Sequence, residues 1–259
     1  MERYGAIDIG TNAARLLIGE VVEEEGHAYV KKIGYTRVPL RLGMEVFTDG
    51  IISSEKERQF IQTMKAFQLL AEVHGVKRIR ACATSAMREA LNGLEVQKNI
   101  LSATGLNIEV IDGAEEAEII FSTFHLMAID QSVPYMVVDV GGGSTEITIF
   151  QDGEKLAGKS FQIGTIRLLK EKVTEQLWKD MKKWVLQYVD KKRAYKVFAT
   201  GGNINKLHKL LGCKVIEPIL VTDLAAFLAE LKSLTLIERM NKYALKPDRA
   251  DVIVPASEI

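Results

Sequence analysis

This chain of 259 residues has few cysteines and histidines and no net charge. Each of these shortages excludes a class of protein. The two cysteines, Cys82 and Cys213, lie far apart, so they form neither a zinc-binding spacing nor a disulfide framework. The four histidines are dispersed and have no metal-ligand spacing. We therefore expect two reduced, buried thiols in a cytosolic protein.

Net charge is also absent, because 34 Lys and Arg residues balance 34 Asp and Glu residues. A protein that coats nucleic acid needs a broad basic surface, so we expect no nucleic-acid partner. A polyanionic substrate is still compatible with this balance. It would have to be held locally, by a groove, a metal ion and backbone N–H groups.

Long hydrophobic runs are missing as well. No apolar stretch approaches the roughly 18 residues that span a bilayer. The N-terminus enters directly into a segment typical of a strand, without a basic segment followed by an apolar run. We therefore expect no membrane span, no signal peptide and a cytoplasmic location.

One sequence pattern begins twice along the chain. Each copy reads Tyr, three residues, Asp, an apolar residue, Gly and then small polar residues, and the two aspartates are Asp8 and Asp139. Each copy is followed by two further strand-like segments and then by helical periodicity. Two matching blocks predict two lobes of one topology, residues 1–128 and residues 129–259. The strands expected in the two blocks are residues 4–8, 13–22 and 28–35, and residues 135–139, 145–151 and 155–161.

The rest of the chain alternates strand and helix signals, which is typical of an α/β protein. Ser54 and Glu57 match a capping box, and apolar residues behind them recur at helical spacing to about residue 74. Further strands are expected at residues 78–83, 107–111 and 196–199, and further helices at residues 86–91, 115–128, 174–191, 205–211 and 222–240.

The two glycine-containing turns are suited to binding phosphate. Glycine lets the backbone approach a ligand closely, and successive N–H groups of a turn can converge on an anion. The alternative is an ordinary hairpin turn in which the Asp satisfies the turn backbone. Because two such turns occur together with a third Gly-Gly turn, we favour phosphate binding. The candidate residues are Thr11, Asn12, Gly141, Gly142, Gly143, Ser144, Thr145, Gly201 and Gly202.

Two carboxylates flank the second turn. Asp139 ends one strand and Glu146 begins the returning strand, so both could bind one Mg²⁺ or Mn²⁺ ion. The alternative for Glu146 is a surface position on the strand. The glycine run is not a P-loop, since no Lys-Ser/Thr follows, and it opens a strand, whereas a dinucleotide fingerprint opens a helix.

A general base is a further possibility at the start of the helix expected from residue 115. Glu115 and Glu116 lie in its first turn, where the helix dipole alone favours acidic residues. The functional alternative is a carboxylate that accepts a proton from a water attacking phosphorus.

Arginines at three turns are candidate anion ligands. Arg88 lies one turn into an expected helix, where a helix N-terminus and a guanidinium together suit an anion, although a surface arginine is the alternative. Arg41 and Arg167 are weaker candidates of the same kind.

Several strings in order along the chain carry a family resemblance. They are IDIGTNAARLLI, ATSAMREALNG, IDGAEEAEIIF, VVDVGGGSTEI, IGTIRL, ATGGNINKL and DRADVIVPA. Together they resemble the exopolyphosphatase/guanosine pentaphosphatase family over nearly the whole chain. The first string alone is shared with sugar kinases and actin-like ATPases, whereas the ordered set is specific.

The resemblance implies the actin-like ATPase fold, with two ribonuclease-H-like lobes, mixed sheets flanked by helices and an active-site cleft between the lobes. It implies hydrolysis of terminal phosphates from polyphosphate, from guanosine pentaphosphate or from both, with Mg²⁺ or Mn²⁺. Homodimers are common in the family. The family's catalytic Glu corresponds to Glu116, and its metal and phosphate residues correspond to Asp139, Gly141, Gly142, Gly143, Ser144 and Glu146, with Thr11, Asn12 and Arg88 from the first lobe.

The chain departs from the family pattern at its C-terminus. It stops at Ile259, where the family continues a helix and adds a stretch that packs between the lobes. We therefore expect a second lobe that is truncated. The longer members' C-terminal helical domains are also absent, which favours short chains or nucleotides as substrates.

Two other functions are compatible with the same residues. An ATP-dependent kinase or ATPase of this fold would keep Gly201 and Gly202 for adenosine but would not need Glu116 as a base. A catalytically weak sensor would bind an alarmone or polyphosphate and release no phosphate.

Overall fold

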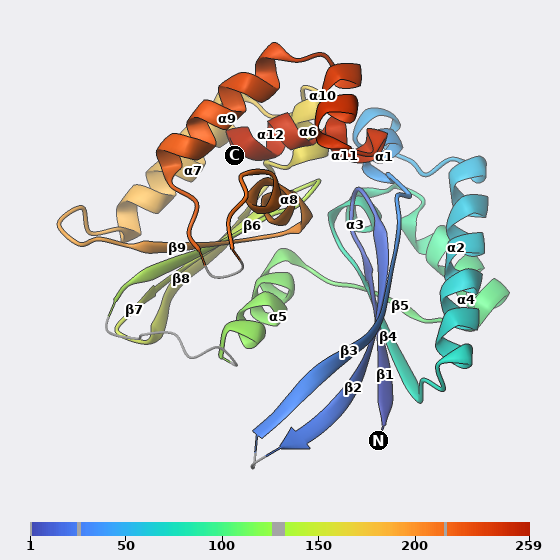
Figure 1. Cartoon of the computed structure of the whole chain (residues 1–259). Coiled ribbons are helices and arrows are strands. Elements are labelled where there is room, and N and C mark those ends of the chain that lie inside the picture. The colour runs from blue at the N-terminus through green and yellow to red at the C-terminus, as the bar shows by residue number, and fades with distance from the viewer. Residues whose placement is uncertain (1, 25–26, 126–132, 215–216) are drawn as a thin grey trace. The chain divides into compact units, whose positions relative to one another are not determined.

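The computed structural model describes residues 2–24, 27–125, 133–214 and 217–259. The chain forms two compact units, Met1–Asp112 and Gly113–Ile259, each built on one mixed sheet (Figure 1). The sequence predicted a boundary after residue 128. The units divide earlier because helix α5 (Gly113–His125) packs on strands β7 and β8 of the second sheet. The end of this helix, expected at about residue 128, lies outside the described residues.

The first unit has a five-stranded sheet in the order β3-β2-β1-β4-β5. Strand β1 is antiparallel to β2 and parallel to β4. The strands are β1 (Arg3–Ile9), β2 (Ala14–Glu24), β3 (His27–Val38), β4 (Arg78–Ala83) and β5 (Ile108–Val110), and the helices are α1 (Gly43–Asp49), α2 (Ser54–Val73), α3 (Ser85–Glu89) and α4 (Gly93–Thr104).

Helix α2 supplies much of the core of this unit. Phe60, Met64 and Phe67 recur at helical spacing and are fully buried. Burial of each stabilises the fold by about 1.5–3 kcal/mol. The side chain of Ser53 caps the helix by accepting a hydrogen bond from the N–H of Lys56. The sequence predicted Ser54, the next residue, as the cap.

The second unit has a four-stranded sheet in the order β8-β7-β6-β9. Its strands are β6 (Tyr135–Val140), β7 (Thr145–Gln151), β8 (Glu154–Phe161) and β9 (Lys196–Thr200). Besides α5, its helices are α6 (Thr165–Leu169), α7 (Glu175–Tyr188), α8 (Gly202–Leu210), α9 (Val221–Ser233), α10 (Leu236–Tyr243), α11 (Pro247–Ala250) and α12 (Ile253–Glu258).

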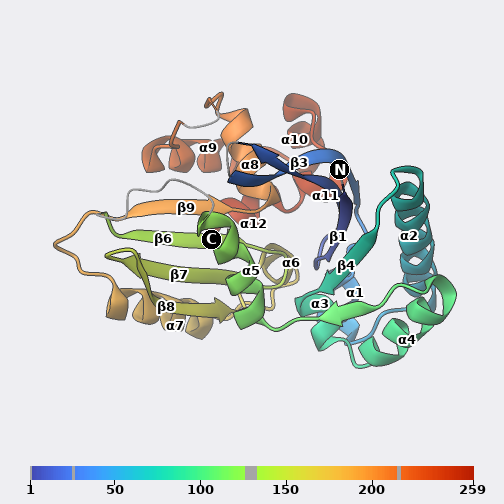
Figure 2. The same ribbon diagram turned by 90° about the horizontal axis from the view of Figure 1, so that it is seen from below.

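Helices cover both faces of this second sheet (Figure 2). Ile147 and Ile149 of β7 belong to the core that α7 completes. Glu146, Thr148 and Phe150 alternate with them and therefore face the side that α5 covers. Strand β7 is consequently buried on both faces. Its successive side chains alternate between the core that α7 completes and the side that α5 covers.

The two units repeat one topology, as the sequence pattern predicted. Three consecutive strands lead into a short helix, α1 in the first unit and α6 in the second. The next strand, β4 or β9, pairs in parallel with the first strand and leads into a helix, α3 or α8. The second unit also carries α9 to α12, whose core residues include Phe227, Leu231 and Ile253 and pack with Leu207 of α8.

Some local expectations need correction. Helix α8 begins at Gly202, so the Gly-Gly pair is the N-terminus of a helix and not only a turn. The helical stretch 222–240 is two helices, because Thr235 and Glu238 form a capping box that starts α10. Cys82 and Cys213 are not disulfide-bonded to each other, and both are only half-buried. Among the described residues, no helix combines the length and apolar character needed to cross a bilayer.

Candidate functional site

The first glycine loop (residues 10–13) connects β1 and β2. The N–H of Gly10 donates to the carbonyl of Ala13 over 3.0 Å, which closes the turn. The carbonyls of Thr11 and Asn12 accept backbone N–H groups from the segment that starts α1, each over 3.0 Å. The Thr11 hydroxyl also lies 2.8 Å from that of Ser85, at the start of α3. Two helix starts therefore fix this loop.

The second glycine loop (residues 141–144) is held in the same way. The N–H of Gly141 donates to the carbonyl of Ser144 over 2.9 Å. The carbonyls of Gly141 and Gly142 accept N–H groups of Thr165 and Ile166, over 3.0 and 2.8 Å, at the start of α6. The repeated sequence pattern thus produces a repeated clamp on the loop carbonyls.

Arg167 completes the clamp on the second loop. Its guanidinium Nε donates to the carbonyl of Gly143 over 2.5 Å, and the residue is only 8% exposed. Arg167 therefore contacts the loop backbone, and its role as an anion ligand stays a prediction. Arg41 likewise lies in the segment that binds the first loop, in the left-handed region with φ 56°.

The clamp leaves one kind of backbone group available. Within the described residues, the N–H groups of Gly142, Gly143 and Ser144 donate to no backbone carbonyl. Successive N–H groups of a turn form a concave anion site when their carbonyls are engaged elsewhere. The second glycine loop has this property through its own geometry.

Gly164 makes the clamp sterically tight. A Cβ atom added there would lie 2.5 Å from the carbonyl carbon of Gly143 and 2.6 Å from that of Gly142. We expect Gly164→Ala to lower the free energy of unfolding by about 1–3 kcal/mol, because backbone must shift to admit the methyl group. Urea unfolding would measure this. Gly34→Ala is a control, since its nearest contacts would be ordinary ones at 3.7 Å. An equal loss in both variants would contradict the prediction.

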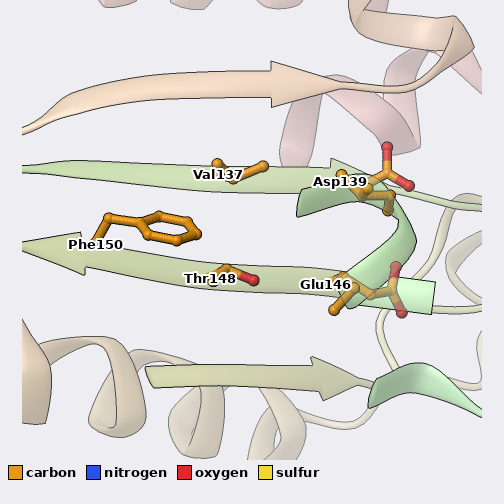
Figure 3. A pocket seen from close by; sticks show the side chains of 7 residues that line it. Val137, Asp139, Glu146, Thr148 and Phe150 are labelled. Atoms are coloured by element: carbon orange, nitrogen blue, oxygen red, sulfur yellow. The ribbon is translucent and has the colours of Figure 1, made fainter. Parts of the chain in front are cut away.

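Asp139 and Glu146 lie directly opposite each other on β6 and β7, beside the second loop. Figure 3 shows both carboxylates at the same end of the two strands. Thr200 donates its hydroxyl to Asp139 Oδ1 over 2.5 Å, and Ser160 donates its hydroxyl to Glu146 Oε1 over 2.7 Å. Each carboxylate is thus oriented by a hydroxyl from a neighbouring strand.

A hollow lies beside these carboxylates, between α5 and the sheet (Figure 3). The hollow leaves room for about one water-sized particle. Apolar side chains line one end of the hollow, and the two carboxylates lie at the other end. It is lined by Ala117, Ile120, Val137, Asp139, Glu146, Thr148 and Phe150.

The carboxylate pair is compatible with a divalent cation. Within the described ranges, no group of three or more His, Cys, Asp or Glu residues forms a complete metal cage. Mg²⁺ commonly binds through one or two carboxylates, with waters and substrate phosphates as its other ligands. Asp139 and Glu146 meet that requirement with oxygen ligands, beside a loop suited to phosphate.

Helix α5 places Glu116 on the same side of the second sheet. Gly113, Ala117 and Ile120 form the stripe of α5 that faces the sheet. Glu116 flanks this stripe and is half-buried, whereas Glu115 is exposed. The helix start therefore distinguishes the two glutamates, and Glu116 is the better candidate for chemistry.

The remaining candidates occupy helix starts. Gly201 has φ 105° and caps α8, and a Cβ atom there would lie 3.2 Å from Asp139 Oδ1. Gly202 packs against the guanidinium of Arg249, which donates to Asn203 Oδ1. In the first unit, the exposed Arg88 lies one turn into α3 and donates to the carbonyl of Ile111 over 2.6 Å.

Comparison with known proteins identifies the family. The model of the Ppx/GppA phosphatase family matches residues 21–259. The chain belongs to the Ppx/GppA phosphatase family. Its actin-like α/β fold, with two mixed sheets flanked by helices, is confirmed by the solved structures that resemble it.

Two curated relatives align with about two thirds of the chain. Exopolyphosphatase 2 of Mycobacterium tuberculosis is 34% identical over 173 residues, which are 65% of this chain and 54% of that protein. Exopolyphosphatase 1 of the same organism is 28% identical over 169 residues, 65% of this chain and 48% of that protein. The chain therefore spans about half the length of the curated relatives it matches.

Two solved structures of the family cover almost all of the chain. An exopolyphosphatase from Cytophaga hutchinsonii has a TM-score of 0.84 and 26% identity, covering 99% of this chain and 88% of that one. The Aquifex aeolicus member of the Ppx/GppA family has a TM-score of 0.72 and 23% identity, covering 99% of this chain and 87% of that one. The second likeness concerns the fold alone.

Proposed function

We propose that this chain is a Mg²⁺-dependent phosphohydrolase that removes terminal phosphate from inorganic polyphosphate, guanosine pentaphosphate or both. One observation carries the proposal. A carboxylate pair, a loop whose N–H groups donate to no backbone carbonyl among the described residues, and a half-buried glutamate occur together in the second unit. Membership of the Ppx/GppA phosphatase family supports the reaction type, and the relatives named exopolyphosphatase favour polyphosphate.

The proposed mechanism assigns one task to each group. The N–H groups of Gly142, Gly143 and Ser144 bind oxygens of the terminal phosphate. Asp139 and Glu146 would hold the Mg²⁺ ion, which neutralises phosphate charge when bound. Glu116 accepts a proton from the water whose oxygen attacks the terminal phosphorus. The bond from that phosphorus to the bridging oxygen breaks, and the shortened chain leaves.

These parts suffice in principle because phosphoryl transfer depends mainly on positioning and charge stabilisation. Thr145, Gly201 and Gly202 are proposed as further phosphate-binding residues. They lie at the same end of the second sheet, where Gly201 approaches Asp139 closely. Thr11, Asn12 and Arg88 are proposed as phosphate ligands of the first unit. For Thr11 and Asn12, the support is the clamp on the first glycine loop, which repeats that on the second. For Arg88, it is the position one turn into α3.

The deciding experiment measures phosphate release from long polyphosphate, tripolyphosphate, guanosine pentaphosphate and ATP, each with Mg²⁺. We expect release from at least one of the first three, and its loss when a chelator is added. Consumption of ATP only with a phosphoryl acceptor would instead indicate a kinase. Tight binding of polyphosphate or guanosine pentaphosphate without release would indicate a sensor.

A further inference from the structure

Four polar residues form one row across the second sheet. Register pairs Ser160 of β8 with Glu146 of β7, Glu146 with Asp139 of β6, and Asp139 with Thr200 of β9. Residues paired in register lie on the same face of a sheet. The order along the row is therefore hydroxyl, carboxylate, carboxylate, hydroxyl.

This arrangement places two like charges next to each other. Carboxylates directly opposite on paired strands repel each other, which destabilises the sheet. Glu146 is also only 3% exposed, so water screens its charge weakly. A divalent cation bound by both groups would remove this repulsion.

The two outer hydroxyls each take one oxygen of the adjacent carboxylate. Ser160 binds Oε1 of Glu146 over 2.7 Å, and Thr200 binds Oδ1 of Asp139 over 2.5 Å. Both contacts restrict the rotation of the carboxylate. Outer partners of this kind fix the geometry of metal ligands and raise metal affinity.

We propose that Ser160 and Thr200 are positioning residues that orient Glu146 and Asp139 for one divalent cation. This inference rests on the metal site of the proposed function. Neither hydroxyl needs to touch the substrate or the cation. Their effect is on the affinity of the carboxylate pair for the cation.

Ser160 has a second contact that concerns the candidate base. A Cβ atom added to Gly113 would lie 2.7 Å from Cβ of Ser160, so the first residue of α5 rests directly on this serine. The same helix carries Glu116 in its first turn. Ser160 thus fixes both the carboxylate of Glu146 and the height of the helix start above the sheet.

Mn²⁺ binding to the protein without substrate, followed by electron paramagnetic resonance, tests the proposal independently of catalysis. We expect Thr200→Val, which keeps the shape but removes the hydroxyl, to weaken Mn²⁺ binding about tenfold. Thr200→Ser keeps the hydroxyl and should bind Mn²⁺ like the wild type. Ser160→Ala should weaken binding about tenfold as well.

A matched control is Ser257→Ala. The Ser257 hydroxyl donates to the carbonyl of Ile253 within α12, so its removal also deletes one hydrogen bond. We expect unchanged Mn²⁺ affinity in this variant. In the phosphate-release assay, raising Mg²⁺ should restore the kcat of Thr200→Val, because only cation affinity is altered.

Wild-type affinity in both Thr200→Val and Ser160→Ala would overturn the proposal, as would an equal loss in Thr200→Ser. If Ser160→Ala does not fold, the Val and Ser variants of Thr200 decide alone. A wild-type protein that does not bind Mn²⁺ would overturn both this inference and the metal site. A wild-type protein that binds Mn²⁺ but releases no phosphate would overturn the proposed function only.

Discussion

Replacing Glu116 by glutamine is expected to lower kcat by about 10³-fold and to leave KM nearly unchanged. Glutamine keeps the size of the side chain but cannot accept the proton of the attacking water. The residue is half-buried at the start of α5, beside the stripe that covers the carboxylate pair, so its substitution affects the reacting region directly. Phosphate release under saturating substrate and Mg²⁺ measures kcat.

Glu115→Gln provides the matched control, because it removes the same charge from the same helix turn at an exposed position. Its kcat should stay close to that of the wild type. A wild-type rate in Glu116→Gln, or an equal loss in both variants, would show that neither position supplies a specific base.

Asp139→Asn is expected to reduce phosphate release by about 10³-fold, since a metal ion contributes several kcal/mol of charge stabilisation. Asparagine can still accept the hydrogen bond from Thr200, so the arrangement of the four polar residues in the row should be kept. Raising the Mg²⁺ concentration should not restore the rate, because the missing group is a ligand itself. This outcome differs from that expected for Thr200→Val.

Asp152→Asn is the control for this substitution. Asp152 lies at the turn between β7 and β8 with φ 53°, a conformation that asparagine also adopts. Its carboxylate makes an exposed ion pair with Arg193, which contributes little to stability. A Mg²⁺ response in Asp139→Asn equal to that of the wild type would exclude Asp139 as a cation ligand.

The strands could be predicted within about three residues of their ends, the largest difference being at the end of β3, because they are short apolar or alternating runs bounded by turns. Residues 145–151 and 78–83 match β7 and β4 at both ends. Helices α1, α4 and α6 were missed. With seven and five residues, α1 and α6 are too short to show a period. The boundary at Asp112–Gly113 depends on where α5 packs, which is a tertiary property.

The site was predictable only where its residues are close in sequence. Asp139 and Glu146 flank a single glycine-rich turn, so the motif suggested their pairing. Ser160 lies 14 residues from Glu146, and Thr200 lies 61 residues from Asp139. Their contacts follow from strand order and register, and the register of β9 cannot be read from local pattern. Counting residues along β7 and β8 from their turn would have pointed to Lys159, because the register shifts by one residue between Ile149 and Phe150.

The row of polar residues also restricts where residues can be inserted into this chain or deleted from it. Side chains alternate between the faces of a strand, so a one-residue insertion in residues 141–144 that is transmitted to β7 sends Glu146 to the face covered by α7. Its carboxylate would then occupy the position of Ile147 in the core. Between β8 and β9, the parallel pairing of β9 with β6 sets the row independently of the connection. Insertions and deletions are therefore expected to accumulate in that connection and to be absent from the glycine turn.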